Sequence, residues 1–466
     1  MKQVCPVIKN EIYSMDITGI GANGEGIGHI DGYILFVDGA ITGDHIEVKV
    51  IKTKKNYGFG RLVTILEPSK DRVEPRCPIA KQCGGCSIMH MKYDAQLEYK
   101  ENHILDALER IGEQDRVKLE QKKDPIIGMD EPWFYRNKVQ FPVQIISGKL
   151  LIGFYAKRSH RIIETPTCYI QDPYNEEIVD TLRDFIVENK ISAYDELKHK
   201  GLLRHIVIRK SHHNQEFHVT LVINGQKFPY DKQLVEELQK LERVVGISLN
   251  VNQEKTNAIL GSEMIHLDGQ EYLHDQIGDI KYQISPLSFY QVNPVQTEKL
   301  YAKALEYVQL SGQEVVYDLY CGIGTISLFL AKQAKHVYGV EIVETAIDDA
   351  RINAEINKID NATFYAGKAE EVMPKLYKED GIKADVVVVD PPRKGCDATL
   401  LDTIININPK RIVYVSCDPG TLARDVKILS QHGYQIDRWC GVDMFSHSTH
   451  VETVVLMSRV KVNTMF

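Results

Sequence analysis

The chain has 466 residues, of which 43% are hydrophobic and 26% charged, and its formal net charge is −8. The composition is typical of a globular protein, and the length suggests about three domains. No apolar stretch is long enough to span a bilayer. The first residues lack the apolar segment of a signal peptide, so we expect a cytoplasmic protein. Nine cysteines are an odd number in a long chain, which favours free, metal-bound or catalytic thiols over disulfides.

The N-terminal part reads as a small all-β unit. From about Ile8 to Leu66, short apolar runs at 33–37, 45–50 and 61–66 alternate with turns rich in Gly and Asp. This pattern predicts a five-stranded barrel of the oligonucleotide-binding type. We place this domain at residues 1–68. A central α+β domain is predicted at 69–280, with a helix over about 93–111, and an α/β domain at 281–466.

Three cysteines follow the predicted barrel at close spacing. Cys77 and Cys83 are separated by five residues, and Cys83 and Cys86 by two. Gly84 and Gly85 would let the short loop wrap around a metal, and Cys168 is the candidate for a fourth ligand. Four thiolates suit either zinc or a [4Fe-4S] cluster, so the spacing alone leaves the choice open.

Basic residues are concentrated locally despite the negative net charge. The stretches 49–61, 132–163 and 198–213 contain no Asp or Glu but several Lys and Arg, and aromatic residues are interleaved in the second. Local charge governs polyanion binding at physiological salt, so these stretches could bind RNA. The alternative is that they are solvated faces of strands.

From about Val315 onward, strands alternate with helices, which predicts a parallel, Rossmann-like sheet. A buried strand ends in the loop Gly322-Ile323-Gly324, and Glu341 ends the next strand, 21 positions after Tyr320. An acid at this distance accepts hydrogen bonds from ribose hydroxyls. The third glycine of the dinucleotide motif is missing, which counts against NAD and favours S-adenosylmethionine.

Two further strands end in reactive residues. Asp390 begins the run Asp-Pro-Pro-Arg-Lys-Gly, and Cys417 lies between a strand and a helix beginning near Gly420, whose N-terminus would favour a thiolate. Glu452 precedes another apolar strand and is the candidate general base. Each residue also has a plain reading, as a small buried side chain or as a solvent-facing acid. Cys321 and Cys440 compete with Cys417 for the role of nucleophile.

Four motifs together resemble the RNA (uracil-5-)-methyltransferase family over essentially the whole chain. They are residues 289–293, 390–395, 416–419 and 450–452. The resemblance implies that Cys417 adds to uracil C6 as nucleophile and that Glu452 removes the C5 proton. It further implies S-adenosylmethionine contacts from Gln291, Tyr320, Glu341 and Asp390, and a [4Fe-4S] cluster held by Cys77, Cys83, Cys86 and Cys168. The family often has Asn where this chain has Thr325.

The N-terminal β unit resembles the TRAM domain, an RNA-binding barrel. In this family the barrel is typical of enzymes acting on ribosomal RNA, so the resemblance implies 23S ribosomal RNA as partner, with no membrane and no obligate protein partner. Transfer RNA, a cytosine target, and an RNA-binding protein with an inactive methyltransferase domain remain alternatives. Radical chemistry is disfavoured, because a fourth ligand at Cys168 would close the open iron that it needs.

Overall fold

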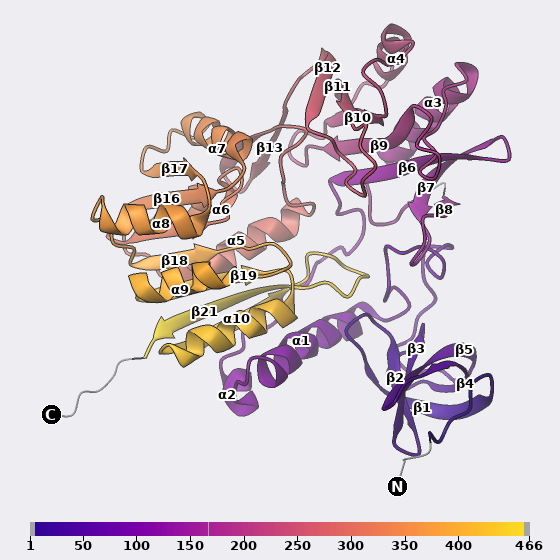
Figure 1. Ribbon diagram of the computed structural model, residues 1–466, viewed down its shortest axis with the longest axis horizontal. Helices are drawn as coiled ribbons and strands as arrows, with labels where there is room; N and C mark the ends of the chain where they lie inside the picture. Colours follow the sequence, from indigo (N-terminus) through magenta and orange to yellow (C-terminus); the bar gives the residue numbers. More distant parts are fainter. Residues whose placement is uncertain (1–4, 166, 461–466) are drawn as a thin grey trace. The chain divides into compact units, whose positions relative to one another are not determined.

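The computed structural model describes residues 5–165 and 167–460. These residues form two compact units, which are described separately here (Figure 1). The first contains the described residues up to His103 together with Ala156–Ser159 and Phe445–His450, and the second contains the other described residues. The three-domain division at residues 68 and 280 stays a prediction.

Five strands in the first unit close into a barrel, which confirms the predicted all-β fold of the N-terminal part. The order around the barrel is β1-β2-β3-β5-β4, and β4 pairs back onto β1. Alternate residues point inward, as in β3, where Leu35 and Val37 are fully buried. The strands are β1 Ile12–Ile20, β2 Gly26–Ile30, β3 Tyr33–Asp38, β4 His45–Thr53 and β5 Tyr57–Glu67.

A buried carboxylate fastens the segment after the barrel. Asp44 is 1% exposed and accepts hydrogen bonds from the backbone N–H groups of Ile41 at 2.8 Å and Ser69 at 2.9 Å. It also accepts one from Arg72 Nε at 3.0 Å. The segment that carries the cysteines therefore leaves the barrel in a fixed direction. Helix α1, Tyr93–Arg110, follows it and spans the boundary between the two units.

The middle of the chain forms a seven-stranded mixed sheet in the second unit. Its order is β12-β11-β10-β9-β6-β7-β8, and β10 and β11 are parallel. One face packs on helices α3 and α4 through a core that includes Phe141, Leu221 and Leu234. The elements are α2 Arg116–Gln121, β6 Lys138–Ile146, β7 Lys149–Tyr155, β8 Ile162–Glu164, α3 Tyr174–Glu188, β9 Leu203–Lys210, β10 Phe217–Ile223, α4 Asp231–Leu238, β11 Val244–Val251 and β12 Glu263–Gly269.

The C-terminal part is a Rossmann-like α/β sheet, as predicted. Its order is β17-β16-β15-β18-β19-β21-β20, in which the first five strands are parallel and β21 is antiparallel to β19. The strands are β15 Val315–Leu319, β16 His336–Glu341, β17 Ala362–Ala366, β18 Val386–Val389, β19 Arg411–Ser416, β20 Tyr434–Val442 and β21 Glu452–Arg459. The hairpin β13 Leu273–Ile277 and β14 Ile280–Ile284 precedes this sheet in the chain.

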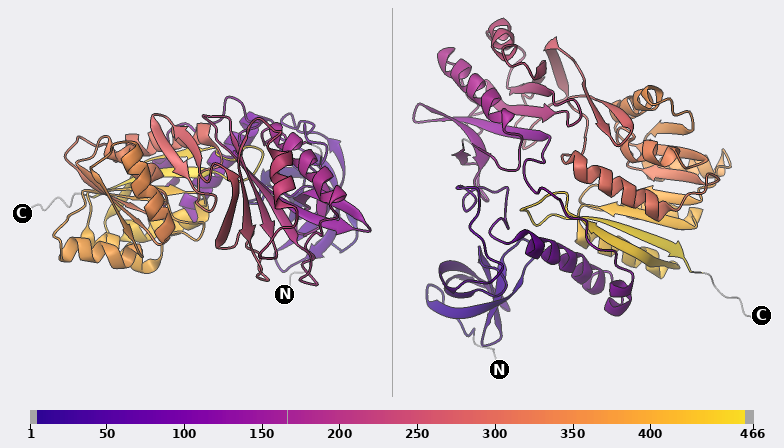
Figure 2. Two further views of the ribbon diagram at one scale, coloured as in Figure 1. Left: turned by 90° about the horizontal axis from the view of Figure 1, so that it is seen from above. Right: turned by 180° about the vertical axis from the view of Figure 1, so that it is seen from behind.

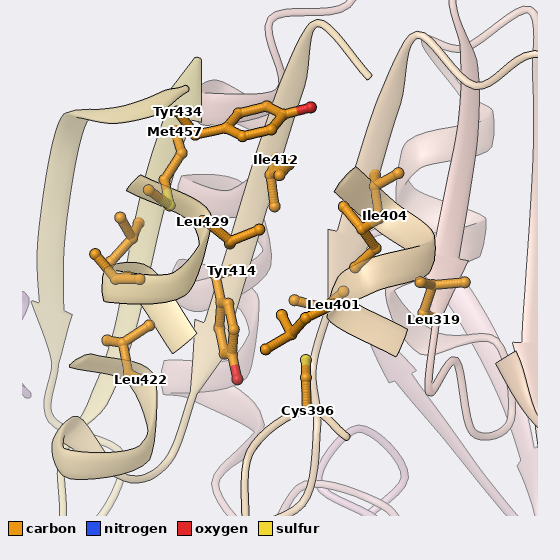
Figure 3. Packing of buried hydrophobic residues seen from close by; sticks show 14 of the residues in the cluster. Leu319, Cys396, Leu401, Ile404, Ile412, Tyr414, Leu422, Leu429, Tyr434 and Met457 are labelled. Carbon is orange, nitrogen blue, oxygen red and sulfur yellow. The ribbon is translucent and has the colours of Figure 1, made fainter. Parts of the chain in front are cut away.

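Helices cover both faces of this sheet. Helices α8, α9 and α10 lie on one face (Figure 1), and α5 lies across the other, as the view from behind shows (Figure 2). On the first face, Tyr414 and Ile412 of β19 pack against Leu422 and Leu429 of α10 (Figure 3). The helices are α5 Pro294–Val308, α6 Thr325–Ala331, α7 Glu344–Ile356, α8 Ala369–Lys378, α9 Ala398–Ile407 and α10 Pro419–Gln431.

Candidate active site

The predicted reactive residues meet at one edge of the α/β sheet. Asp390 follows β18 and Cys417 follows β19, at the carboxyl ends of adjacent parallel strands. Glu452 is the first residue of β21, and because β21 runs the other way, its amino end lies at this same edge. In open α/β sheets this edge is where ligands bind, above all where the strand order reverses, here between β15 and β18.

The strand register places Cys417 and Glu452 next to each other. Ser416 pairs with Thr453 in the β19–β21 ladder, so the next step of the register sets Cys417 opposite Glu452. Burial raises the pKa of the Cys417 thiol to about 12, and the charges of Glu452 and Asp390 add to this effect. The predicted low-pKa cysteine is therefore absent from the ligand-free protein, because burial and two carboxylates outweigh the helix N-terminus.

The two carboxyl groups of this edge also influence each other. Burial raises the pKa of Glu452 to about 8, with a further contribution from Asp390. Burial raises the pKa of Asp390 to about 7, with a further contribution from Asp318. Both groups therefore hold or release a proton near neutral pH, which is the range that suits a general acid or base.

Three side chains of this cluster received no role in the sequence analysis. Arg393 is the cation whose charge lowers the pKa of both Cys417 and Glu452. Tyr301 of α5 is buried among the carboxyl groups and donates from its hydroxyl to Thr325 Oγ1 at 3.0 Å. Asp318 could have been found in the sequence, because it is a charged residue inside the apolar strand 315–319. Nothing in the sequence distinguished Tyr301.

Asp318 lies completely buried beneath the glycine loop. Its Oδ2 accepts a hydrogen bond from Ser327 Oγ at 2.5 Å, and its Oδ1 has no hydrogen-bond partner within 5–165 and 167–460. Burial raises the pKa of Asp318 to about 7. An unsatisfied buried oxygen at a ligand-binding edge is a free acceptor for a ligand that donates a hydrogen bond.

The glycine loop after β15 has the geometry of a nucleotide-binding turn. Tyr320, Gly322 and Gly324 have φ angles of 66°, 54° and 79°, and a left-handed Tyr costs enough conformational energy to suggest a functional constraint. Glu341 Oε2 accepts from Gly322 N at 3.3 Å, and Oε1 accepts from Val343 N at 3.0 Å. The carboxylate is thus held beside the loop with lone pairs left for a ligand.

Gln291 reaches the second unit's interior from the segment before α5. Gln291 is 8% exposed, and its backbone carbonyl oxygen accepts a hydrogen bond from Asn137 Nδ2 at 3.0 Å. Asn293, two residues on, caps α5 by accepting from Gln296 N at 3.2 Å and donates from Nδ2 to Met444 O at 3.0 Å. The backbone beside Gln291 is therefore fixed from two sides.

The competing cysteines are less suited to be nucleophiles. Cys321 and Cys440 are 4% and 0% exposed, whereas Cys417 is only half-buried. Cys440 donates from Sγ to Pro125 O at 3.3 Å. A nucleophile must reach its substrate, which favours Cys417 over both.

The cysteine cluster of the first unit is partly assembled. Cys77 lies close enough to Cys83 for its charge to raise the Cys83 pKa, although burial has the larger effect. Gly85 N donates to Cys83 Sγ at 3.4 Å. Across the residues that the structure describes, no three His, Cys, Asp or Glu side chains converge as a metal site would require. Cys168 belongs to the second unit.

The basic stretches differ in how much of their charge is available. In 49–61, residues 51–57 are exposed, and Tyr57 packs edge-on against Phe59. In 198–213, Arg204 and Arg209 are buried and donate to backbone carbonyl groups, Arg204 to Asn252 O at 2.6 Å. The barrel stretch therefore keeps its charges available to a ligand, whereas Arg204 and Arg209 of 198–213 serve the fold. None of the described helices combines the length and apolarity needed to cross a membrane.

Comparisons with known proteins agree with this geometry. A family profile described as tRNA (Uracil-5-)-methyltransferase matches residues 175–460, and a TRAM domain profile matches residues 6–63. An uncharacterized RNA methyltransferase of Clostridium tetani is 50% identical over 459 residues, which are 98% of this chain and 98% of that protein. One from Halalkalibacterium halodurans is 50% identical over 457 residues, 98% of this chain and 99% of its own.

A solved structure is similar over nearly the whole length. Pyrococcus abyssi tRNA (uracil-54, C5)-methyltransferase, in complex with S-adenosyl-L-homocysteine, is 28% identical with a TM-score of 0.76. The match covers 96% of this chain and 100% of that chain. A match this long includes most of the N-terminal barrel, so a barrel by itself does not separate enzymes of ribosomal RNA from those of transfer RNA.

Proposed function

Because the chain belongs to the tRNA (uracil-5-)-methyltransferase family and is an S-adenosylmethionine-dependent RNA methyltransferase, we propose that it methylates C5 of a uridine in 23S ribosomal RNA through a covalent bond to Cys417. The observation that carries the mechanism is the β19–β21 register, which sets Cys417 opposite Glu452 beside Asp390. One face of a flat pyrimidine can then meet the thiol while the carboxylate reaches C5.

The chemistry requires both side chains because uracil C5 is a poor nucleophile. The Cys417 thiolate forms a bond to C6, and the electron pair of the C5–C6 double bond moves toward C5 and O4. S-Adenosylmethionine, when bound, supplies the methyl group that C5 takes up. Glu452 then accepts the C5 proton, the double bond returns, and the C6–sulfur bond breaks to release the thiolate.

The described residues fit S-adenosylmethionine. Glu341 would accept hydrogen bonds from the ribose hydroxyls. The exposed apolar side chains of Ile342 and Val343 follow it in the chain and would pack against the adenine ring. Tyr320 in its left-handed conformation, Gln291 and Asp390 would complete the contacts. Thr325 is engaged by Tyr301, so its hydroxyl would orient that tyrosine rather than the cofactor.

We assign Cys77, Cys83, Cys86 and Cys168 to a [4Fe-4S] cluster. The proposal is supported by the spacing of the first three and by the Gly85 N–H bond to Cys83 Sγ, a type of bond that stabilises cluster sulfur atoms. Within residues 5–165 and 167–460, no three of these side chains converge as a metal site would require, and we expect a bound cluster to draw them together. Its role would be structural, because four protein ligands leave no open iron.

The choice of 23S ribosomal RNA rests on the family resemblance alone, because the exposed basic stretch of the barrel supports an RNA substrate of either kind. Transfer RNA is the second candidate, because the similar Pyrococcus abyssi enzyme carries that substrate in its name. Labelled cofactor, purified 23S and transfer RNA, and digestion to nucleosides separate the two. Label in transfer RNA alone would refute the 23S assignment, and label in 5-methylcytidine would refute the uridine assignment. We also propose a cytoplasmic location, which is supported by the RNA substrate and by the free cysteines.

The covalent step is tested with RNA that contains 5-fluorouridine, because fluorine cannot leave as a proton. We expect an adduct that survives denaturing electrophoresis and that disappears in Cys417→Ala. The matched control is Cys440→Ala, which removes a buried thiol and should keep the adduct. In Glu452→Gln, a covalent complex should accumulate even with ordinary RNA. Full methyl transfer by Cys417→Ala would rule out the mechanism.

The cluster has an independent readout. Protein purified without oxygen should contain iron and acid-labile sulfide and absorb visible light, and serine at any of Cys77, Cys83, Cys86 or Cys168 should reduce all three. Stoichiometric zinc with no sulfide would contradict the assignment.

A further inference from the structure

The segment between β18 and α9 carries two groups of the site but has no regular structure of its own. Residues 390–397 form neither helix nor strand. Asp390 is the first residue of this segment and Arg393 lies three residues further on. Arg393 is the cation that favours the charged forms of both Cys417 and Glu452. Something outside the segment must therefore fix it, because electrostatic effects of this kind depend strongly on distance.

A buried carboxylate of α10 supplies that fixation. Asp425 is 0% exposed. Its Oδ2 accepts hydrogen bonds from the backbone N–H of Cys396 at 2.8 Å and from the Tyr414 hydroxyl at 2.7 Å. Figure 3 shows the Tyr414 hydroxyl directed toward Cys396, between α9 and α10. Asp425 thus joins the loop to α10, which begins two residues after Cys417.

Neighbouring residues of α10 hold the same loop. Arg424 donates from Nε to Asp425 Oδ1 at 2.7 Å, and from Nη2 to the carbonyl oxygen atoms of Lys394 and Cys396, both at 3.1 Å. Thr421 Oγ1 donates to Arg393 O at 3.1 Å. The contacts reach four consecutive loop residues, 393–396, when the tight approach of Gly395 is included.

Gly395 shows how closely the two segments approach. Its φ is +76°, and a Cβ there would lie 2.6 Å from Arg424 Nη2 and 2.7 Å from Asp425 Oδ2. Only glycine fits both the conformation and the space. The loop is therefore pressed against the Arg424–Asp425 pair and not merely near it.

Burying a carboxylate costs free energy that an apolar side chain would not. The hydrogen-bond partners of Asp425 lie in α10, in the loop and in β19, the strand that Cys417 follows. We propose that Asp425 is a positioning residue, which holds the Asp390–Cys396 segment against α10 and thereby sets the Arg393 guanidinium relative to Cys417 and Glu452. This inference rests on the proposed function, since it concerns the same site.

The charged groups that face Cys417 come from three elements: Glu452 from β21, Asp390 from the end of β18, and Arg393 from the loop. Two of the three, Asp390 and Arg393, belong to the segment that Asp425 holds. Loosening the segment would move the cation and one anion together, so both the binding of the cofactor and the formation of the thiolate should suffer.

Hydrogen–deuterium exchange tests the fixation without any substrate. In Asp425→Asn we expect the Cys396 amide to exchange at least about tenfold faster, with β18 and β19 unchanged. The matched control is Asp385→Asn at the opposite end of the same sheet, where Asp385 accepts from Val315 N at 3.1 Å and from Lys410 Nζ at 2.9 Å. If Asp425→Asn does not fold, Arg424→Gln should show the same local change.

A double-mutant cycle tests the link to Arg393, with single-turnover methyl transfer as the readout. Asp425→Asn should slow transfer at least about tenfold in the wild-type background, because small displacements of catalytic groups are costly. In an Arg393→Ala background it should slow transfer by less than about twofold, since the two residues then act through one interaction. Asp385→Asn should leave the rate unchanged in both backgrounds.

The outcomes are distinguishable. Equal slowing of both backgrounds by Asp425→Asn, or unchanged Cys396 exchange in both folded variants, overturns the inference and leaves the proposed function intact. A wild-type protein that methylates neither RNA overturns the proposed function, while the exchange measurement still decides whether Asp425 holds the loop.

Discussion

Replacing the proposed base with its amide should make the protein inactive and more stable. Glu452 is 4% exposed, and burial raises its pKa from 4.5 to about 8. Because the folded-state pKa lies above the unfolded value, the folded protein binds this proton more tightly than the unfolded chain does. The residue therefore costs little stability at acidic pH, and the cost grows as the pH rises from 4.5 to 8.

The size of the effect follows from linkage between protonation and folding. For a pKa of 4.5 in the unfolded chain and about 8 in the folded protein, the penalty is about 1 kcal/mol at pH 5, about 3 kcal/mol at pH 7 and about 5 kcal/mol at pH 9. Glu452→Gln removes the ionisation, so its stability advantage over wild type should follow this curve. Functional sites often carry such costs, which selection for activity maintains.

Urea denaturation at several pH values measures the stability difference between Glu452→Gln and wild type, and tryptophan fluorescence can restrict the measurement to the α/β sheet. Trp439 is fully buried in β20, next to β21, and only one other tryptophan, Trp133, is present. In a Trp133→Phe background, the fluorescence of Trp439 reports on the α/β sheet. Glu355→Gln, an exposed position on α7, is the matched control and should change stability by less than about 0.5 kcal/mol at every pH.

A second readout comes from the thiol. The charge of Glu452 raises the pKa of Cys417, so Glu452→Gln should also speed alkylation of Cys417 at a fixed alkaline pH. An advantage that stays constant from pH 5 to pH 9, or that shrinks as the pH rises, would refute the reasoning, because it would mean that Glu452 is not held in its protonated form by burial.

Three further predictions concern the barrel, the segment between α2 and β6, and the cofactor. A Cβ on Gly60 would lie 2.1 Å from the Val48 side chain of β4, so Gly60→Val should lower stability by about 1–3 kcal/mol in thermal melts. A Cβ on Gly19 would have no other atom within 4 Å, so the control Gly19→Ala should not lower stability. Asp124 accepts a hydrogen bond from Arg438 Nη2 at 2.6 Å. Asp124→Ala should lower the free energy of unfolding, measured by urea denaturation, by about 2 kcal/mol. A decrease below about 0.5 kcal/mol would contradict this prediction. Burial and a second carboxyl group raise the pKa of Asp390 to about 7. Since a cation favours the ionised form, calorimetry should show S-adenosylmethionine binding tightening by up to about tenfold in total from pH 6 to pH 8. Weaker binding at higher pH would contradict this.

Local sequence pattern carries the fold where neighbouring residues decide it. The apolar run from Tyr33 to Val37 predicted a barrel strand, and the apolar run 386–389 predicted a strand of the α/β sheet; both strands form. The middle sheet could not be predicted in detail. Its central pairing joins β6 to β9, segments about 70 positions apart in which Phe141 faces Ile206, and no local signal encodes a partner at that distance.

The candidate site likewise contains residues that the sequence could predict and residues that it could not. Glu341, Asp390 and Cys417 were predictable because each ends an apolar strand, and parallel strands bring such residues to one edge. The role of Asp425 was not, because its partners Cys396 and Tyr414 lie 29 and 11 positions away. The basic stretch 198–213 was misleading in part, since charge in a sequence does not reveal that Arg204 and Arg209 are used inside the fold.

The raised thiol pKa bears on the order of events in the proposed mechanism. With a pKa of about 12, Cys417 is almost entirely a neutral thiol at pH 7 in the ligand-free protein. Part of this suppression comes from the charge of Glu452, which is itself mostly protonated at that pH because its pKa is about 8. Protonated Glu452 does not oppose the thiolate, so addition to C6 is easiest while Glu452 holds its proton. Once sulfur is bound to carbon it carries no charge. Glu452 can then release its proton to water and, as a carboxylate, accept the C5 proton. That proton neutralises Glu452 at the moment the thiolate is released, so the two negative charges are never needed together.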